Sequence, residues 1–92
     1  MQVQVGYRIQ VWGRVQGVGF RYQTQQLARE LGITGFVVNK IDGSVLIEAE
    51  GVATNIIKFI NAVKASPSPF GEVMRSQIDK IDMVGYQTFE IR

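Results

Sequence analysis

The chain passes from a strand-like segment into a helix-like segment through the run Gly13-Arg14-Val15-Gln16-Gly17-Val18-Gly19-Phe20-Arg21. Glycine adopts positive φ readily and lets backbone amides converge on one oxyanion. A helix that begins near Phe20 adds unpaired amides and the positive end of its dipole. Arg21 adds a planar, permanently charged guanidinium that can bind two phosphate oxygens at once. The run therefore predicts an anion-binding loop, and phosphate fits it best.

Apolar residues recur with different spacings before and after this loop. Before it, apolar residues recur at every second position, which predicts a half-buried strand: Val3, Val5, Tyr7, Ile9 and Val11. After it, one helical face carries Phe20, Thr24, Leu27, Ala28 and Leu31, and Gly32 is placed to end the helix. The order is strand, loop, helix.

The remainder predicts four more strands and a second helix. Strands are expected at 36–39 and 45–50, joined through Asp42-Gly43, with a helix at about 54–65 that ends at Ser66-Pro67-Ser68-Pro69. A fourth strand is placed around Ile78, Lys80, Asp82 and Val84, and a short fifth at 88–92 on a sheet edge. The order β-α-β-β-α-β predicts an α+β, ferredoxin-like split βαβ sandwich, with two helices on one face of an antiparallel sheet.

Composition limits the possible functions. The 92 residues are 46% hydrophobic and 20% charged, which predicts one small globular domain over residues 1–92. The chain has no cysteine and no histidine, which excludes thiolate nucleophiles, Ser-His-Asp hydrolases and Cys/His zinc sites. A net charge of +2 without a basic run argues against nucleic acid as a partner. No signal peptide or membrane span is visible, so we expect a cytoplasmic protein.

Two stretches resemble the acylphosphatase family. The first is Val11-x-Gly13-x-Val15-Gln16-Gly17-Val18-x-Phe20-Arg21. The second is Gly35-Phe36-Val37-Val38-Asn39-Lys40-Ile41-Asp42-Gly43-Ser44-Val45, followed by Gly51. The chain departs from the family in two places: Val38 stands where a polar or basic residue is usual, and the segment between Met83 and Thr88 lacks the usual acidic, proline-bearing loop.

The resemblance implies the same fold and a metal-independent hydrolase that cleaves small acyl phosphates to carboxylate and inorganic phosphate. It implies that Arg21 and Asn39 are catalytic, that Asn39 orients a water, and that the molecule is a monomer with no cofactor, metal or membrane partner. The phosphate-binding loop it implies comprises Val15, Gln16, Gly17, Val18, Gly19, Phe20 and Arg21. Two alternatives remain: a non-enzymatic module that binds RNA or an anion, and a unit of a larger carbamoyl-transferring maturation enzyme.

Other conspicuous residues receive structural interpretations. The spacing of the acidic residues matches no calcium loop, so we interpret them as solvated strand positions: Asp42, Glu48, Glu50, Asp79 and Asp82. We expect Met74 and Met83 to fill the core and Trp12 to lie at the loop edge and shield the site. Arg14 and Lys40 are exposed cations that attract anionic substrates or serve no purpose.

Overall fold

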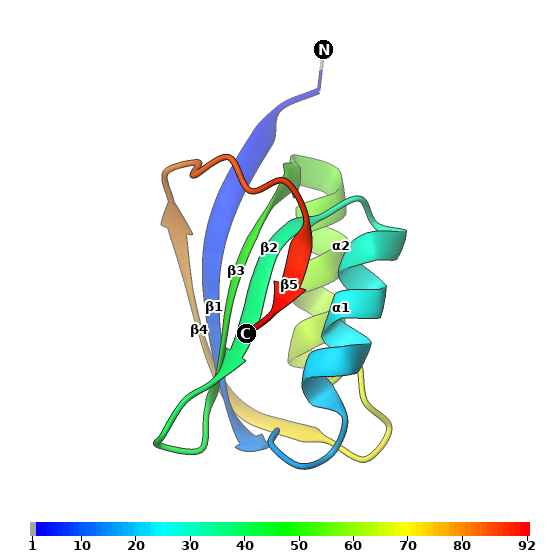
Figure 1. The fold of residues 1–92 in the computed structure, drawn as a ribbon, viewed down its shortest axis with the longest axis vertical. Helices are drawn as coiled ribbons and strands as arrows, with labels where there is room; N and C mark the ends of the chain where they lie inside the picture. Colours follow the sequence, from blue (N-terminus) through cyan, green and yellow to red (C-terminus); the bar gives the residue numbers. More distant parts are fainter. Residues whose placement is uncertain (1) are drawn as a thin grey trace.

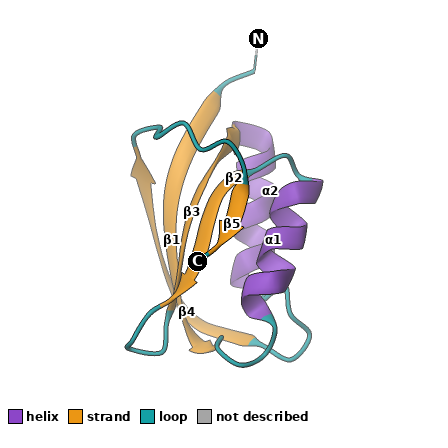
Figure 2. Ribbon diagram, viewed as in Figure 1, coloured by secondary structure: helices purple, strands orange, loops and turns teal. Residues whose placement is uncertain are grey.

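Two helices cover one face of a five-stranded sheet in the computed structural model, which describes residues 2–92 (Figures 1 and 2). The elements are β1 (Gln4–Arg14), α1 (Phe20–Glu30), β2 (Thr34–Asn39), β3 (Val45–Val52), α2 (Ala53–Lys64), β4 (Glu72–Ile81) and β5 (Phe89–Ile91). The ferredoxin-like α+β fold and its element order are confirmed. Neither helix in the described part of the chain is long and apolar enough to cross a membrane.

The sheet has the order β4-β1-β3-β2-β5 and is mixed rather than wholly antiparallel. The first three neighbouring pairs are antiparallel, but β5 pairs parallel with β2. Strands β4 and β2 run in opposite directions, so a chain that leaves β4 and crosses at one end of the sheet returns parallel to β2. Figure 1 shows this crossing.

The core lies between the sheet and the helices. Alternate residues of the central strands point toward the helices, among them Ile9 and Val11 of β1 and Ile47 of β3. Helix α1 covers β2 and β5, whereas α2 covers β1 and β3. The helices contribute Phe20, Thr24, Ala28, Ile56, Phe59 and Val63 to the buried layer. Removing this apolar surface from water is the main force that fixes both helices to the sheet.

The fourth strand begins earlier than the sequence predicts. Its pairing with β1 starts at Arg14↔Glu72, passes a register shift between Trp12 and Gly13, and ends at Ile81. Residues 82–84, which were expected to continue the strand, belong instead to a connection over residues 82–88 that we call the strap. The strap leaves the sheet because a carboxylate from β3 binds its amides.

That carboxylate belongs to Glu50, which is only 2% exposed. It accepts hydrogen bonds from the amides of Val84, Gly85 and Tyr86, the last two at 3.0 Å. Its neighbour Glu48 accepts the Tyr86 hydroxyl at 2.6 Å and pairs with Arg8 at 2.9 Å. The interpretation of Glu48 and Glu50 as solvated is therefore wrong, because the strap covers both.

The expectation that Met74 and Met83 fill the core is also wrong. Met74 is 77% exposed on the edge strand β4, and Met83 is exposed on the strap. Neither segment faces the helices. An edge strand and an external connection leave even large apolar side chains in solvent.

Candidate active site

Backbone amides without protein acceptors line the turn between β1 and α1, residues 15–19, which we call the glycine loop. Gly17 and Gly19 both have positive φ, 75° and 78°, a conformation that other residues adopt only with strain. Gly19 is also the N-cap of α1, and Gln23 is the first residue of α1 whose amide bonds back, to the Gly19 carbonyl at 3.1 Å. Within residues 2–92, the amides of residues 16–22 donate to no protein acceptor.

Two side chains hold the glycine loop in place. The side-chain Nε2 of Gln16 donates to the carbonyls of Lys40 and Ser44 at 2.8 and 2.9 Å, which ties the loop to the turn between β2 and β3. On the other side, the buried Ser68 hydroxyl donates to the Val18 carbonyl at 2.5 Å. The free amides therefore belong to a fixed backbone, which is the condition for electrostatic preorganisation.

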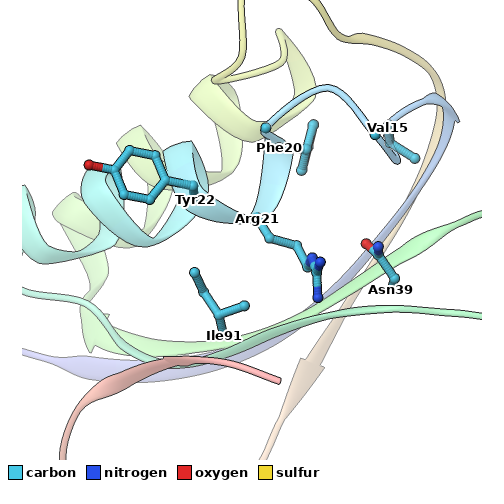
Figure 3. Close-up of a pocket in the computed structure, with 8 residues that line it drawn as sticks. Val15, Phe20, Arg21, Tyr22, Asn39 and Ile91 are labelled. Carbon is cyan, nitrogen blue, oxygen red and sulfur yellow. The ribbon is translucent and has the colours of Figure 1, made fainter.

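The loop forms one wall of a pocket of about 220 Å³ (Figure 3). The pocket is lined by Val15, Gly17, Gly19, Phe20, Arg21, Tyr22, Asn39 and Ile91. Val15 and Phe20 are buried and give it an apolar base. Figure 3 shows the Arg21 guanidinium directed toward the Asn39 amide. Residues from α1 and from the end of β2 therefore share one cavity.

Arg21 enters the pocket from the first turn of α1. Its Nη1 donates to the backbone oxygen of Arg92 at 3.2 Å, which orients the guanidinium from the far side. Arg92 is itself held by its own side chain, whose guanidinium carbon lies 4.3 Å from the centre of the Phe36 ring. No acidic side chain among the described residues pairs with Arg21. Its remaining N–H groups keep their full capacity to bind an anion.

Asn39 is the last residue of β2. Its Oδ1 is buried and has no hydrogen-bond partner among residues 2–92. An acceptor in this position is costly unless something donates to it, and such groups in native structures call for an explanation. Because the Asn39 side chain lines a pocket that Arg21 also lines, a functional explanation is the natural one.

The turn that follows Asn39 is fixed by Asp42. The carboxylate accepts the amide and the hydroxyl of Ser44, at 2.9 and 2.5 Å, and these bonds, led by the hydroxyl, lower the pKa of Asp42. The Trp12 indole donates to the same carboxylate at 3.3 Å. Trp12 belongs to β1 and is not among the pocket residues, so the expectation that it shields the site is wrong. It braces the turn instead.

The sequence-predicted residues divide into two groups. Val15, Gly17, Gly19, Phe20, Arg21 and Asn39 line the pocket. The Gln16 side chain points away to the β2–β3 turn, and Val18 packs against the core. Sequence reasoning missed Tyr22, Ile91 and the backbone oxygen of Arg92. Tyr22 follows Arg21 directly, so the motif itself offered a signal for it, whereas nothing local pointed to the last strand.

The pocket also bears on metal binding. Among residues 2–92, no group of three or more acidic, histidine or cysteine residues lies close enough together to hold a metal ion. The charged group that reaches into the cavity is the guanidinium of Arg21. The arrangement can bind an oxyanion through Arg21 and the loop amides while Asn39 holds a polar molecule beside it.

Comparison with known proteins places these features in a family. The acylphosphatase family model matches residues 7–91. An acylphosphatase of Ligilactobacillus salivarius (strain UCC118) is 42% identical over 85 residues, which cover 92% of this chain and 94% of that protein. The crystal structure of acylphosphatase from Bacillus subtilis superimposes with a TM-score of 0.92 at 41% identity, covering 98% of this chain and 99% of that one. Full-length HypF, in a phosphate- and nucleotide-bound form, matches with a TM-score of 0.92 at 29% identity over 12% of its length.

Proposed function

The chain belongs to the acylphosphatase family and is a hydrolase of acyl phosphates, and we propose that Arg21, Asn39 and the amides of the glycine loop carry out the reaction. One observation carries this proposal. Asn39, whose Oδ1 has no partner among residues 2–92, lines the same cavity as a guanidinium without an acidic side-chain partner and a run of free amides. These groups are the ones needed to hold a phosphoryl group and a water together.

The substrate's chemistry explains why so few groups suffice. An acyl phosphate is a mixed anhydride, and its leaving group is a carboxylate whose conjugate acid has a pKa of about 4 by analogy with Asp and Glu. Such a group departs as the anion without prior protonation. A general acid is therefore unnecessary, which fits a chain with no histidine.

The phosphoryl group binds between Arg21 and the glycine loop. The guanidinium supplies two parallel N–H groups to its oxygens, and the amides of residues 16–20 supply further donors around it. These donors are fixed before the substrate arrives, so they stabilise the charge that moves onto the oxygens in the transition state. Arg92 and Gln16 act as positioning residues for the two parts of this cradle.

In the proposed mechanism, Asn39 binds and orients the attacking water. A carboxamide can both accept a hydrogen bond from the water and donate one to it, so the side chain aims the water without being basic enough to deprotonate it. In the proposed step the water oxygen bonds to phosphorus and the bond to the acyl oxygen breaks on the opposite side. The water's proton passes to a phosphate oxygen, giving inorganic phosphate and a carboxylate.

The experiment is an assay of the purified protein on benzoyl phosphate and acetyl phosphate with EDTA present. We expect hydrolysis of both, and for Asn39→Ala a loss comparable to the ~10²–10³-fold caused by removing one oxyanion-site donor. Asn61→Ala, on the exposed face of α2, is the matched control and keeps normal turnover. A folded Asn39→Ala variant with normal turnover would refute the assigned role. Activity lost to EDTA would contradict metal independence.

Three further expectations belong to this proposal. The protein acts as a monomer, it has no nucleic-acid partner, and it works in the cytoplasm. The pocket is lined by residues of a single chain, and the +2 charge is spread over ten basic and eight acidic residues, which supports the first two. Sedimentation of the active protein tests the first. A salt-dependent shift with single-stranded RNA would contradict the second.

A further inference from the structure

Two exposed apolar side chains lie at the mouth of the pocket. Tyr22 of α1 is 57% exposed and Ile91 of β5 is 40% exposed, and both line the same cavity as Arg21. They come from elements that are distant in sequence, and α1 packs against β5. Single exposed apolar residues are common on protein surfaces. A pair from two elements at one pocket mouth is a surface that a ligand can contact.

The side on which they lie follows from the reaction geometry. In an in-line displacement, the attacking water and the leaving group are on opposite sides of phosphorus. Figure 3 shows Asn39 on one side of the Arg21 guanidinium and Ile91 and Tyr22 on the other. If Asn39 holds the water, the acyl group leaves toward Ile91 and Tyr22.

We infer that Tyr22 and Ile91 form an acyl shelf, a surface that contacts the acyl half of the substrate and favours aromatic or branched apolar acyl groups. The inference rests on the proposed function, because it takes the water side from Asn39. An apolar acyl group on the shelf loses contact with water, and so do the two side chains. The shelf is open, so the selectivity is modest, at the lower end of the 10- to 200-fold that one methylene in a hydrophobic pocket provides.

Other exposed apolar residues do not share this position. Ile41 is fully exposed in the β2–β3 turn, next to Asp42, and Ile57 is 60% exposed on α2. Neither is among the residues that line the pocket. Ile57 therefore serves as a matched control for a change that shortens an exposed aliphatic side chain.

The test compares kcat/KM for benzoyl phosphate and acetyl phosphate in each variant. The ratio of the two values, taken relative to the wild type, cancels the difference in intrinsic reactivity between the substrates. We expect the ratio of kcat/KM for benzoyl phosphate to kcat/KM for acetyl phosphate to fall by about fivefold to tenfold in Tyr22→Ala and in Ile91→Ala. Tyr22→Phe retains the ring and keeps the ratio, and Ile57→Ala leaves both kcat/KM values unchanged. Competitive inhibition by inorganic phosphate checks the phosphoryl half of the pocket in each variant.

The outcomes separate this inference from the proposed function. A wild type that hydrolyses both substrates, with a ratio that neither alanine variant changes, overturns the acyl shelf and leaves the proposed function standing. A Tyr22→Phe variant that loses as much as Tyr22→Ala also overturns it, because the contact would then depend on the hydroxyl. A wild type that hydrolyses neither substrate refutes both. Circular dichroism and urea unfolding check that Ile91→Ala keeps the overall fold and stability. If it does not, the exposed Tyr22 still provides the test.

Discussion

The strap and the glycine loop both gather backbone amides around an oxyanion position, but only the amides of the strap bind a carboxylate side chain of the protein, that of Glu50 in β3. In the strap, the amides of residues 84–86 converge on the buried carboxylate of Glu50. In the glycine loop, the amides of residues 16–20 find no acceptor among the described residues, and Arg21 adds a cation that pairs with no acidic side chain among them. We call the strap the closed region, because its amides already bind a protein anion, and the glycine loop with Arg21 the open region, because its amides do not.

The difference teaches how a small domain assigns stability and binding to separate regions. A buried carboxylate that accepts several amides stabilises the native state, since charge-assisted hydrogen bonds are the stronger ones. Donors that remain free contribute nothing to folding but are ready for a ligand. We therefore expect changes in the strap to affect unfolding and changes in the loop to affect turnover.

Removing the Arg21 cation beside the glycine loop should have the largest effect on turnover. Arg21→Ala is expected to lower kcat/KM for acetyl phosphate by at least ~10²–10³-fold, because it removes the charged donors that hold the phosphoryl group. The free energy of unfolding should change by less than ~0.5 kcal/mol, as for surface substitutions in general. Arg29→Ala, in the last turn of the same helix, is the control. Turnover that survives in folded Arg21→Ala would break the comparison.

Neutralising Glu50, the anion of the strap, tests the expectation that the strap contributes to stability. Glu50→Gln replaces a charged acceptor of three amides and places an NH₂ group against donors, so the free energy of unfolding should fall by about 2–3 kcal/mol. Its kcat/KM should change far less than that of Arg21→Ala. Urea unfolding and the same assay measure both. The exposed ion pair of Glu90 with Arg92 gives the control, Glu90→Gln, with an expected cost below ~1 kcal/mol.

One glycine from each region provides a matched pair. Gly19 and Gly85 have φ of 78° and 92°, and an added Cβ meets no atom within 4 Å at either position. Alanine at each should therefore cost a similar ~1–2 kcal/mol of backbone strain. Only Gly19→Ala should also lower kcat/KM, because only the glycine loop is proposed to bind the substrate through its amides. Equal kinetic effects of the two substitutions would show that the division between the regions is wrong.

The smallest effect concerns Tyr86, whose hydroxyl donates to Glu48 beneath the strap. Burial first, and then this hydrogen bond, raises the pKa of Tyr86 to about 12 from its ordinary 10. The folded state therefore keeps a proton that the unfolded state loses, and the stability from this group disappears as pH rises from about 10 to about 12. Tyr86→Phe should flatten that decline and cost ~1 kcal/mol at pH 7. Urea unfolding across this range measures it, with Tyr22→Phe as the control.

Sequence patterns predicted the parts of this fold in which local periodicity and burial agree. The two-residue period of β1, the helical face of α1 from Phe20 to Ala28 and the Asp42-Gly43 turn all lie where they were expected. The fourth strand was misplaced because β4 is an edge strand with few buried residues, so its sequence carries little periodic signal. The burial of Glu50 depends on the strap 34 residues away, a partner that composition and spacing do not reveal.

The candidate site was predicted in the same uneven way. The glycine spacing and Arg21 belong to one short motif, so their proximity follows from local chain geometry. The meeting of Arg21 with Asn39 depends on the sheet order and was reached through the family resemblance. The acyl shelf and the position of the Arg92 backbone oxygen depend on the parallel pairing of β5, and an expected antiparallel sheet gave no reason to look for them.

The hydrogen bond from Arg21 to Arg92 spans 71 residues, nearly the full length of the chain. During translation the helix that carries Arg21 leaves the ribosome well before β5, so the central strands and both helices are available to fold first. The guanidinium then acquires its rear support only when the final strand docks. Because β5 has three residues and forms one edge of the sheet, it is also the first candidate to fray. Nascent and partly frayed molecules would thus have a folded body but an incompletely braced arginine, and under the role proposed for Arg21 their activity would appear last and be lost first.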